Sequence, residues 1–462
     1  MSIGIADAFH TLVRDSWAES ALSNLYSSRY KAAAVTPVVE GSIVFLEVRD
    51  KSLSDNFRLL RAAIERRRSA KSIPYTVSVI CIREGIDSRT SVLRSCLKAI
   101  PLIASAQFVF IDGSSLFLDS LPLRKETTVI QTWYACGAFK RFGNSLNDQE
   151  SDRRKRDRGH ALAYRNQSYV TVSASEVVWA YAEAFHMEDR IERILPIGVS
   201  RTDMFFSSKY REKACEKAAW ILRRMAPELF LDRKDEAKVS DSGLDATSRR
   251  AAYARLGDVY SDQPKESALA VGQGIVPGKK VILYAPTFRG TESKAVAPNR
   301  LDIPLMKREL GSSCILLINH HPLIKEIDRP KIPDDCRDFA FDMSDRLSIE
   351  ELLTASDVCI TDYSSIIFEY SLFERPLLFF AYDMQEYLDE RGFFYPIREM
   401  MPGPICSTTQ ELTEILKTPG AEFDLVRVRE FKYRFMSGCD GHATARIMQL
   451  MDRISEKNSN ER

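Results

Sequence analysis

The stretch that decides the fold is Ser356-Asp357-Val358-Cys359-Ile360-Thr361-Asp362-Tyr363-Ser364-Ser365-Ile366-Ile367-Phe368-Glu369-Tyr370. Residues 358–360 form a short β-prone run that is typical of a buried strand. Asp362 then turns the chain, and Ser364 or Ser365 can cap the helix that follows. Such a junction directs backbone N–H groups and the positive end of a helix dipole to one point, which favours a phosphate. An ordinary capped strand–helix junction has the same residues, so the serines alone leave both interpretations open.

Strand-like and helix-like segments alternate on both sides of this stretch. In the first half, apolar runs predict strands at 42–48, 75–82, 107–112, 128–133 and 193–197. In the second half, they predict strands at 281–286, 315–318, 358–360 and 376–382. Serine–glutamate capping boxes at 173–176 and 348–351 mark expected helix starts. This alternation indicates an α/β fold with two αβα Rossmann-like domains facing a cleft, and ligands bound at the carboxyl ends of the strands.

The length of 462 residues is too great for one hydrophobic core and predicts more than one domain. We expect five parts: an N-terminal segment of unknown role (1–41), a first Rossmann-like domain (42–208), a charged helical linker or insert (209–273), a second Rossmann-like domain (274–450) and a polar tail (451–462). The linker is assigned from its alternating charges and its few large apolar residues.

Composition excludes several classes of protein. The formal net charge is +1, so no overall field attracts nucleic acid. The nine cysteines show no close paired spacing, which indicates reduced core residues and neither disulfides nor a zinc site. No secretory signal or membrane-spanning apolar run is visible in the sequence. We therefore expect a protein of the cytoplasm or of the cytoplasmic face of a membrane.

Four motifs follow predicted strands in order. They are Trp-Tyr-Ala-Cys-Gly-Ala-Phe-Lys-Arg-Phe-Gly at 133–143, Tyr-Ala-Pro-Thr-Phe-Arg-Gly at 284–290, Asn-His-His-Pro at 319–322 and Thr-Asp-Tyr-Ser-Ser at 361–365. Together with 198–203, 387–393 and 440–443, this ordered set resembles the CDP-glycerol glycerophosphotransferase family, the enzymes of teichoic acid and related capsule polymers. The resemblance extends from about Ser42 to Leu450.

The resemblance implies a GT-B fold and a reaction without a metal or other cofactor. Glycerol phosphate, or a similar polyol phosphate such as ribitol phosphate, would pass from CDP-glycerol to a hydroxyl of a growing polymer or a lipid-linked primer, with release of CMP. His321 would offset charge on the departing CMP, although His321-Pro322 also fits a simple turn after a strand. The candidate substrate-binding residues are Arg289, Asp362, Ser364, Ser365, Glu369, Arg201 and Lys140.

One position departs from the family pattern. The family has a histidine after the tryptophan of the first motif, taken to be the general base, and this chain has Tyr134. Tyrosine, with an unperturbed pKa of about 10, is a poor base near neutrality. The enzyme would then be slow or use another residue, act on a different acceptor, or bind CDP-glycerol without turning it over. A GT-B glycosyltransferase that uses a nucleotide sugar is a further alternative.

A basic run, Arg153-Arg154-Lys155-Arg156-Asp157-Arg158, follows the first motif. It is either a solvated loop or a patch that binds an anion. The anion would be an acceptor polymer or the acidic headgroups of lipids, and contact with lipids would make the protein a peripheral membrane protein. No aromatic residues are interleaved with these basic residues, which argues against nucleic acid as a partner.

Overall fold

The computed structural model describes residues 16–71, 75–84, 86–148, 163–230, 275–290, 294–390, 392–417 and 423–460. The chain forms two compact units. The first contains Met1–Phe206, Gln385–Met400 and Glu430–Arg462, and the second contains Ser207–Met384 and Met401–Arg429. The basic run 153–158 and the part of the expected linker from 231 to 273 lie outside the described residues.

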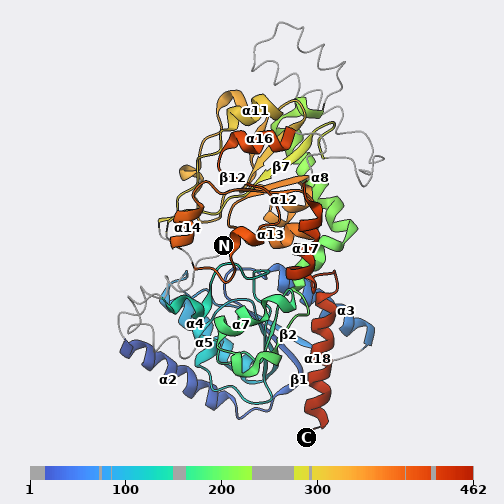
Figure 1. Ribbon diagram of the computed structural model, residues 1–462. Helices are drawn as coiled ribbons and strands as arrows, with labels where there is room; N and C mark the ends of the chain where they lie inside the picture. The colour runs from blue at the N-terminus through green and yellow to red at the C-terminus, as the bar shows by residue number, and fades with distance from the viewer. Residues whose placement is uncertain are drawn as a thin grey trace. The chain divides into compact units, whose positions relative to one another are not determined.

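The first unit is built on a parallel six-stranded sheet in the order β2-β1-β3-β4-β5-β6. Strands β1 and β2 of this sheet are labelled in Figure 1. Its strands are β1 (Val39–Glu47), β2 (Thr76–Cys81), β3 (Ala106–Ile111), β4 (Thr128–Gln131), β5 (Tyr169–Thr171) and β6 (Ile194–Leu195). Its helices are α2 (Ser16–Ala33), α3 (Asp55–Lys71), α4 (Arg89–Ala104), α5 (Leu116–Ser120), α7 (Val178–Phe185), α15 (Ile397–Met400) and α18 (Ala443–Asn460). Two further helices, α14 (Met384–Glu390) and α17 (Leu425–Met436), have residues in both units.

Both faces of the first sheet are buried. Alternate residues of a strand point to opposite faces, so residues of β1 belong to two different apolar clusters. Val44 and Leu46 of β1 pack in the cluster that includes residues of α2, α4 and α5. Ile43 and Phe45 pack instead with residues of α3 and α18. The C-terminal helix therefore completes the core of the first unit. From the sequence we expect 274–450 to form the second domain. In the structure, residues 430–450 belong to the first unit, because the apolar face of α18 packs on the first sheet.

The second unit has its own parallel six-stranded sheet, in the order β12-β11-β10-β7-β8-β9. Its strands are β7 (Lys280–Tyr284), β8 (Cys314–Ile318), β9 (Ala340–Asp342), β10 (Val358–Thr361), β11 (Leu377–Phe380) and β12 (Ile405–Cys406). Its helices are α8 (Ser208–Met225), α11 (Ile303–Leu310), α12 (Ile349–Ala355), α13 (Ile366–Ser371) and α16 (Thr409–Lys417). Residues of α11 and α16 join one buried face of this sheet in a single apolar cluster.

The predicted fold class is confirmed: the chain is α/β, with two parallel sheets in Rossmann-like units. The expected capping box at Ser348 forms, with Glu351 as its partner. The one expected at 173–176 was wrong, because the residue that precedes the helical segment is Ala174 and the hydroxyl of Ser173 bonds elsewhere.

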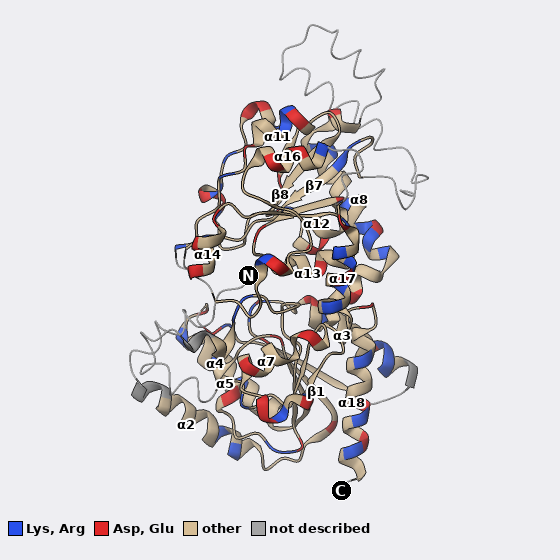
Figure 2. Ribbon diagram, viewed as in Figure 1, with Lys and Arg blue, Asp and Glu red and all other residues tan. Residues whose placement is uncertain are grey.

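Basic and acidic residues are interspersed along the described elements of both units, in keeping with a net charge of +1 (Figure 2). None of the helices in the described ranges combines the length and apolar character needed to span a bilayer.

Candidate functional site

The strand order of the second unit reverses between β7 and β10. The chain adds β8 and β9 on one side of β7, and then β10, β11 and β12 on the other. In open α/β sheets, ligands bind at the carboxyl ends of the strands next to such a reversal. Two of the sequence motifs, at 284–290 and 361–365, occupy these ends.

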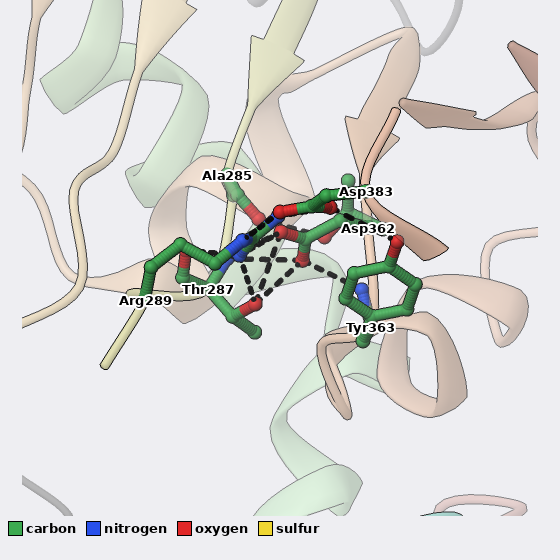
Figure 3. A network of polar contacts seen from close by, with 7 residues as sticks. Ala285, Thr287, Arg289, Asp362, Tyr363 and Asp383 are labelled. Atoms are coloured by element: carbon green, nitrogen blue, oxygen red, sulfur yellow. Dashed lines mark hydrogen bonds and ion pairs between the residues drawn. The ribbon is translucent and has the colours of Figure 1, made fainter. Parts of the chain in front are cut away.

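The carboxylate of Asp362 is the centre of a buried network at this reversal (Figure 3). It follows β10 directly and accepts hydrogen bonds from the backbone N–H and the hydroxyl of Thr287, at 3.0–3.1 Å. Its own next residue, Tyr363, donates a backbone N–H at 2.6 Å. Asp362 therefore ties the loop after β7 to the end of β10.

Arg289 adds a third loop to this network. Its Nη1 lies 2.9 Å from Asp362 Oδ2, while its Nε and Nη2 donate to Asp383, beyond the end of β11. Burial opposes the charge of Arg289, but the hydrogen bonds to Asp383 and the charge of Asp362 outweigh it and raise the pKa of Arg289. Each of the three guanidinium nitrogens is thus engaged with protein. In this arrangement Arg289 positions three strand-end loops.

The expected phosphate cradle lies at the start of α13. Ser364 Oγ accepts from the backbone N–H of Ile366 at 3.4 Å, which is a long contact. Ser365 is the residue that precedes the helix, and its exposed side chain makes no capping bond with the described residues. Of the two expected caps, Ser364 is therefore the one in contact with the helix start. Glu369 is buried within this short helix.

The two histidines after β8 have different surroundings. His321 is half-buried beside Phe288, with 4.8 Å between the ring centroids, and its Nδ1 accepts from the backbone N–H of Leu323 at 3.3 Å. An accepting Nδ1 leaves the proton of a neutral imidazole on Nε2, which can then donate to a ligand. His320 is buried, and burial lowers its pKa although the charge of Asp342 opposes this.

The first unit has a corresponding reversal between β1 and β3. Here β2 lies on one side of β1, and β3 to β6 lie on the other. Arg49 follows β1 and Asp112 follows β3, and Arg49 Nη2 lies 3.2 Å from Asp112 Oδ2. Glu47, at the end of β1, is fully buried, and its pKa is raised by burial and by the charge of Asp112.

Tyr134 lies at this same end of the first sheet. The Cζ atom of Arg49 is 4.6 Å from the centroid of the tyrosine ring. The residue before it, Trp133, has a φ of 47°, which costs on the order of 1–3 kcal/mol for a residue with a side chain. Asn56 Nδ2 donates to the carbonyl of Trp133 at 2.7 Å, and Gln131 Oε1 accepts from its N–H at 3.1 Å. These buried amides hold the turn that presents Tyr134.

Arg201 is linked to the same turn through Asn56. The backbone N–H of Arg201 donates to Asn56 Oδ1 at 2.9 Å. The Nδ2 of the same side-chain amide donates to the carbonyl of Trp133, so one side chain connects the 198–203 and 133–143 motifs. The structure thus brings Arg201 and Tyr134, two predicted site residues, to one end of the first sheet.

The remainder of the 133–143 motif is anchored by residues from distant parts of the chain. The hydroxyl of Tyr181 lies 3.2 Å from the carbonyls of Ala135 and Gly137. Ser173 Oγ accepts from the N–H of Gly137 at 3.1 Å, which is what this serine does instead of capping a helix. Lys140 forms an isolated antiparallel bridge with Phe393 and lies over the ring of Tyr387, with 5.0 Å from Nζ to its centroid.

Sequence reasoning missed Arg49, Asp112, Asn56 and Asp383. A signal existed for Asp112, because it is the last residue of the expected strand 107–112, much as Asp362 comes soon after the expected strand 358–360. Asn56 and Asp383 had none, since their partners are 77 and 94 residues away. Among the described residues, no group of three or more His, Cys, Asp or Glu side chains is placed to hold a metal ion.

The sequence profile of the CDP-glycerol:poly(glycerophosphate) glycerophosphotransferase family matches residues 28–223 and 255–452, which include both sheets. The chain belongs to this family. It is accordingly a transferase of the teichoic acid biosynthesis type.

Named relatives include enzymes for two polyols. The chain is 30% identical to the teichoic acid ribitol-phosphate primase of Bacillus spizizenii over 433 residues, 93% of this chain and 96% of the relative. It is 26% identical to the teichoic acid glycerol-phosphate primase of Bacillus subtilis over 361 residues, 78% of this chain and 76% of the relative. A structure of the wall teichoic acid polymerase TagF superimposes with a TM-score of 0.64 at 20% identity, covering 99% of this chain and all of that one, which shows a shared fold.

Proposed function

We propose that this protein transfers a polyol phosphate, glycerol phosphate in the first instance, from its CDP derivative to a hydroxyl of a cell-surface polymer or a lipid-linked primer. The observation that carries the proposal is the match of the family profile across both units, with the family motifs at the carboxyl ends of both sheets. The acceptor hydroxyl oxygen forms a bond to the β-phosphorus and loses its proton to solvent, the bond from that phosphorus to the bridging oxygen breaks, and CMP leaves with the electron pair.

On the donor side, we assign the pyrophosphate to the half-exposed groups after β8 and β10. Ser364, Ser365 and the Nε2–H of His321 are hydrogen-bond donors of the kind that stabilises developing phosphate charge. His321 would donate to the phosphate of the departing CMP. Arg289 and Asp362 act here by holding the loops in place, because their charged atoms already face each other and Asp383. Glu369, buried in α13, is a further candidate.

On the acceptor side, we assign the attacking hydroxyl to the end of the first sheet, near Tyr134, with Lys140 and Arg201 as further candidate contacts. The family pattern has a histidine where this chain has Tyr134. A phenol at this place donates a hydrogen bond but seldom accepts a proton near pH 7. The loose transition state of phosphoryl transfer asks little of a base, so turnover does not require the histidine.

The test is CMP release by the purified chain. CDP-glycerol and CDP-ribitol are compared as donors, each with a lipid-linked primer analogue and with a short polyol phosphate polymer as acceptors. Glycerol phosphate transfer predicts CMP release that depends on both CDP-glycerol and an acceptor. Preference for CDP-ribitol would assign the other polyol. Release of UDP from a UDP-sugar, with no CMP released from either CDP-polyol, would favour a glycosyltransferase.

A second candidate is a family member that binds CDP-glycerol without transferring its glycerol phosphate. The residue in its favour is Tyr134, which stands where the family resemblance implies a histidine base and whose ring centroid lies 4.6 Å from Arg49 Cζ. Tight binding of CDP-glycerol by calorimetry, with no CMP released for any acceptor, would support this reading over the first.

A further inference from the structure

The acceptor end of the first unit contains an arginine whose hydrogen-bonding capacity is only partly used. Arg49 pairs with Asp112 through Nη2 alone, at 3.2 Å. Its Nε is buried and has no hydrogen-bond partner among the described residues, and the same holds for Oδ1 of Asp112. A buried polar atom left unpaired costs about 1–3 kcal/mol, so such atoms call for an explanation.

The second unit provides a comparison within the same chain. Arg289 occupies the corresponding place, where an arginine after the first strand meets an aspartate across the strand reversal. All three of its nitrogens have protein partners, in Asp362, Asp383 and Thr287. Arg289 therefore has the contacts of a structural residue. Arg49 has the same position but a single carboxylate partner, which leaves donors for another molecule.

The surroundings of Arg49 hold it ready for a ligand. Asp112 is fully buried and fixes one edge of the guanidinium, and the ring of Tyr134 covers one of its faces at 4.6 Å. The side chain of Arg49 remains 20% exposed. A planar guanidinium held in this way is suited to phosphate oxygens, which it binds through charge-assisted hydrogen bonds. The neighbouring Trp133, with its strained backbone, is a second sign that this turn is kept for function.

We propose that Arg49 binds a phosphate group of the acceptor, next to the hydroxyl that attacks, and that Asp112 is the positioning residue that orients it. This inference rests on the proposed function, because it takes the acceptor to be a polyol phosphate chain or a phosphate-linked lipid primer. It assigns to the first unit an anion contact that lies beside Tyr134, on a different sheet from the donor residues.

The test compares Arg49→Gln, Arg49→Lys and a control, Arg58→Gln. Arg58 is in the same unit but 65% exposed, so its replacement changes the charge equally without touching the site. The probe is a trimer of glycerol phosphate, titrated calorimetrically into the full chain, and CDP-glycerol is titrated separately. Arg49→Gln should weaken trimer binding by about 10–100-fold, the loss of one or two hydrogen bonds to a charged group.

Arg49→Lys should retain part of the affinity, since it keeps the charge but loses the fork, and Arg58→Gln should bind as the parent does. In the transfer assay, the KM for the acceptor should rise in Arg49→Gln while the affinity for CDP-glycerol stays the same. Arg49→Lys also keeps a cation beside Asp112, so circular dichroism of the two variants would reveal a fold defect confined to Arg49→Gln.

Three results would overturn the proposal: a parent that does not bind the trimer, an Arg49→Gln variant that binds it equally well, or an equal loss of CDP-glycerol affinity. The last would place Arg49 in the donor site. Absence of CMP release by the parent would count against the proposed function, while the trimer titrations would still decide the role of Arg49.

Discussion

Replacing Arg289 by methionine should lower the free energy of unfolding of the second unit far more than the same replacement of an arginine in an exposed ion pair would. The side chain of Arg289 is 19% exposed, and its partners Asp362 and Asp383 are 2% and 13% exposed. Removing one member of such a buried cluster leaves the other charges uncompensated and typically costs about 3–5 kcal/mol. Methionine keeps the apolar volume of the side chain, so the loss reflects the charges and not a cavity.

Hydrogen exchange measured by mass spectrometry on peptides covering 280–290 and 358–363 reports this unit alone. We expect faster exchange in Arg289→Met at both peptides, because the loops after β7 and β10 lose their common anchor. The matched control is Arg337→Met. That arginine pairs with Asp334 at 2.5 Å, but the two side chains are 61% and 88% exposed, and such pairs contribute about 0–1 kcal/mol.

Arg289→Met combined with Asp383→Asn should recover part of the protection, since one of the two uncompensated carboxylates is removed. Exchange in Arg289→Met no faster than in the Arg337 control would refute the reasoning. If that result came with a large loss of CDP-glycerol affinity, Arg289 would be a direct ligand of the pyrophosphate, as the sequence alone suggested.

Three further predictions concern the proposed reaction. Ser365→Ala and His321→Ala should each weaken CDP-glycerol binding by about 1.5–3 kcal/mol without unfolding the chain, as calorimetry would show; unchanged affinity in both would remove them from the donor site. Tyr134→His should raise the rate of CMP release at least about tenfold, toward the 10²–10⁴ typical of a positioned base, and the gain should appear as the pH rises through the imidazole pKa, because only neutral imidazole accepts the proton. No gain over the parent, with an inert Tyr134→Phe, would argue that this position does not govern catalysis. Neutralising three arginines of the 153–158 run should reduce sedimentation with anionic vesicles at low salt, and equal sedimentation of parent and variant would favour the solvated loop.

The sheets could be predicted from the sequence because their signal is local. Apolar runs such as 315–318 and 358–360 fall within β8 and β10, and a strand buried on both faces needs no partner information to be recognised. The strand ends were predictable for the same reason, and the family resemblance named Asp362 and Tyr134 as candidates at two of them.

The contacts that make the site were beyond sequence reasoning. The capping box at 173–176 shows why: a serine followed by a glutamate three residues later fits a helix start, but Ser173 lies beside Gly137 and bonds to it instead. In the same way, Arg289 and Asp383 meet only because β7 and β11 lie on either side of β10. The partner of each of these side chains depends on the tertiary arrangement of the strands and not on the residues next to it in the sequence.

The return of the chain to its first unit has a consequence for biosynthesis. The chain passes between the units after Phe206, Met384, Met400 and Arg429, and α18 is added to the first sheet last. Ile447 and Met451 of α18 share an apolar cluster with Phe45 and Phe108. Helix α3 covers part of this face early in synthesis, but the part that α18 covers stays exposed until that helix has left the ribosome. Domains of many proteins fold one after another during synthesis, the N-terminal one first. Here the N-terminal unit is the last to be completed, and a nascent chain stopped at residue 429 would expose to chaperones the apolar residues that α18 covers.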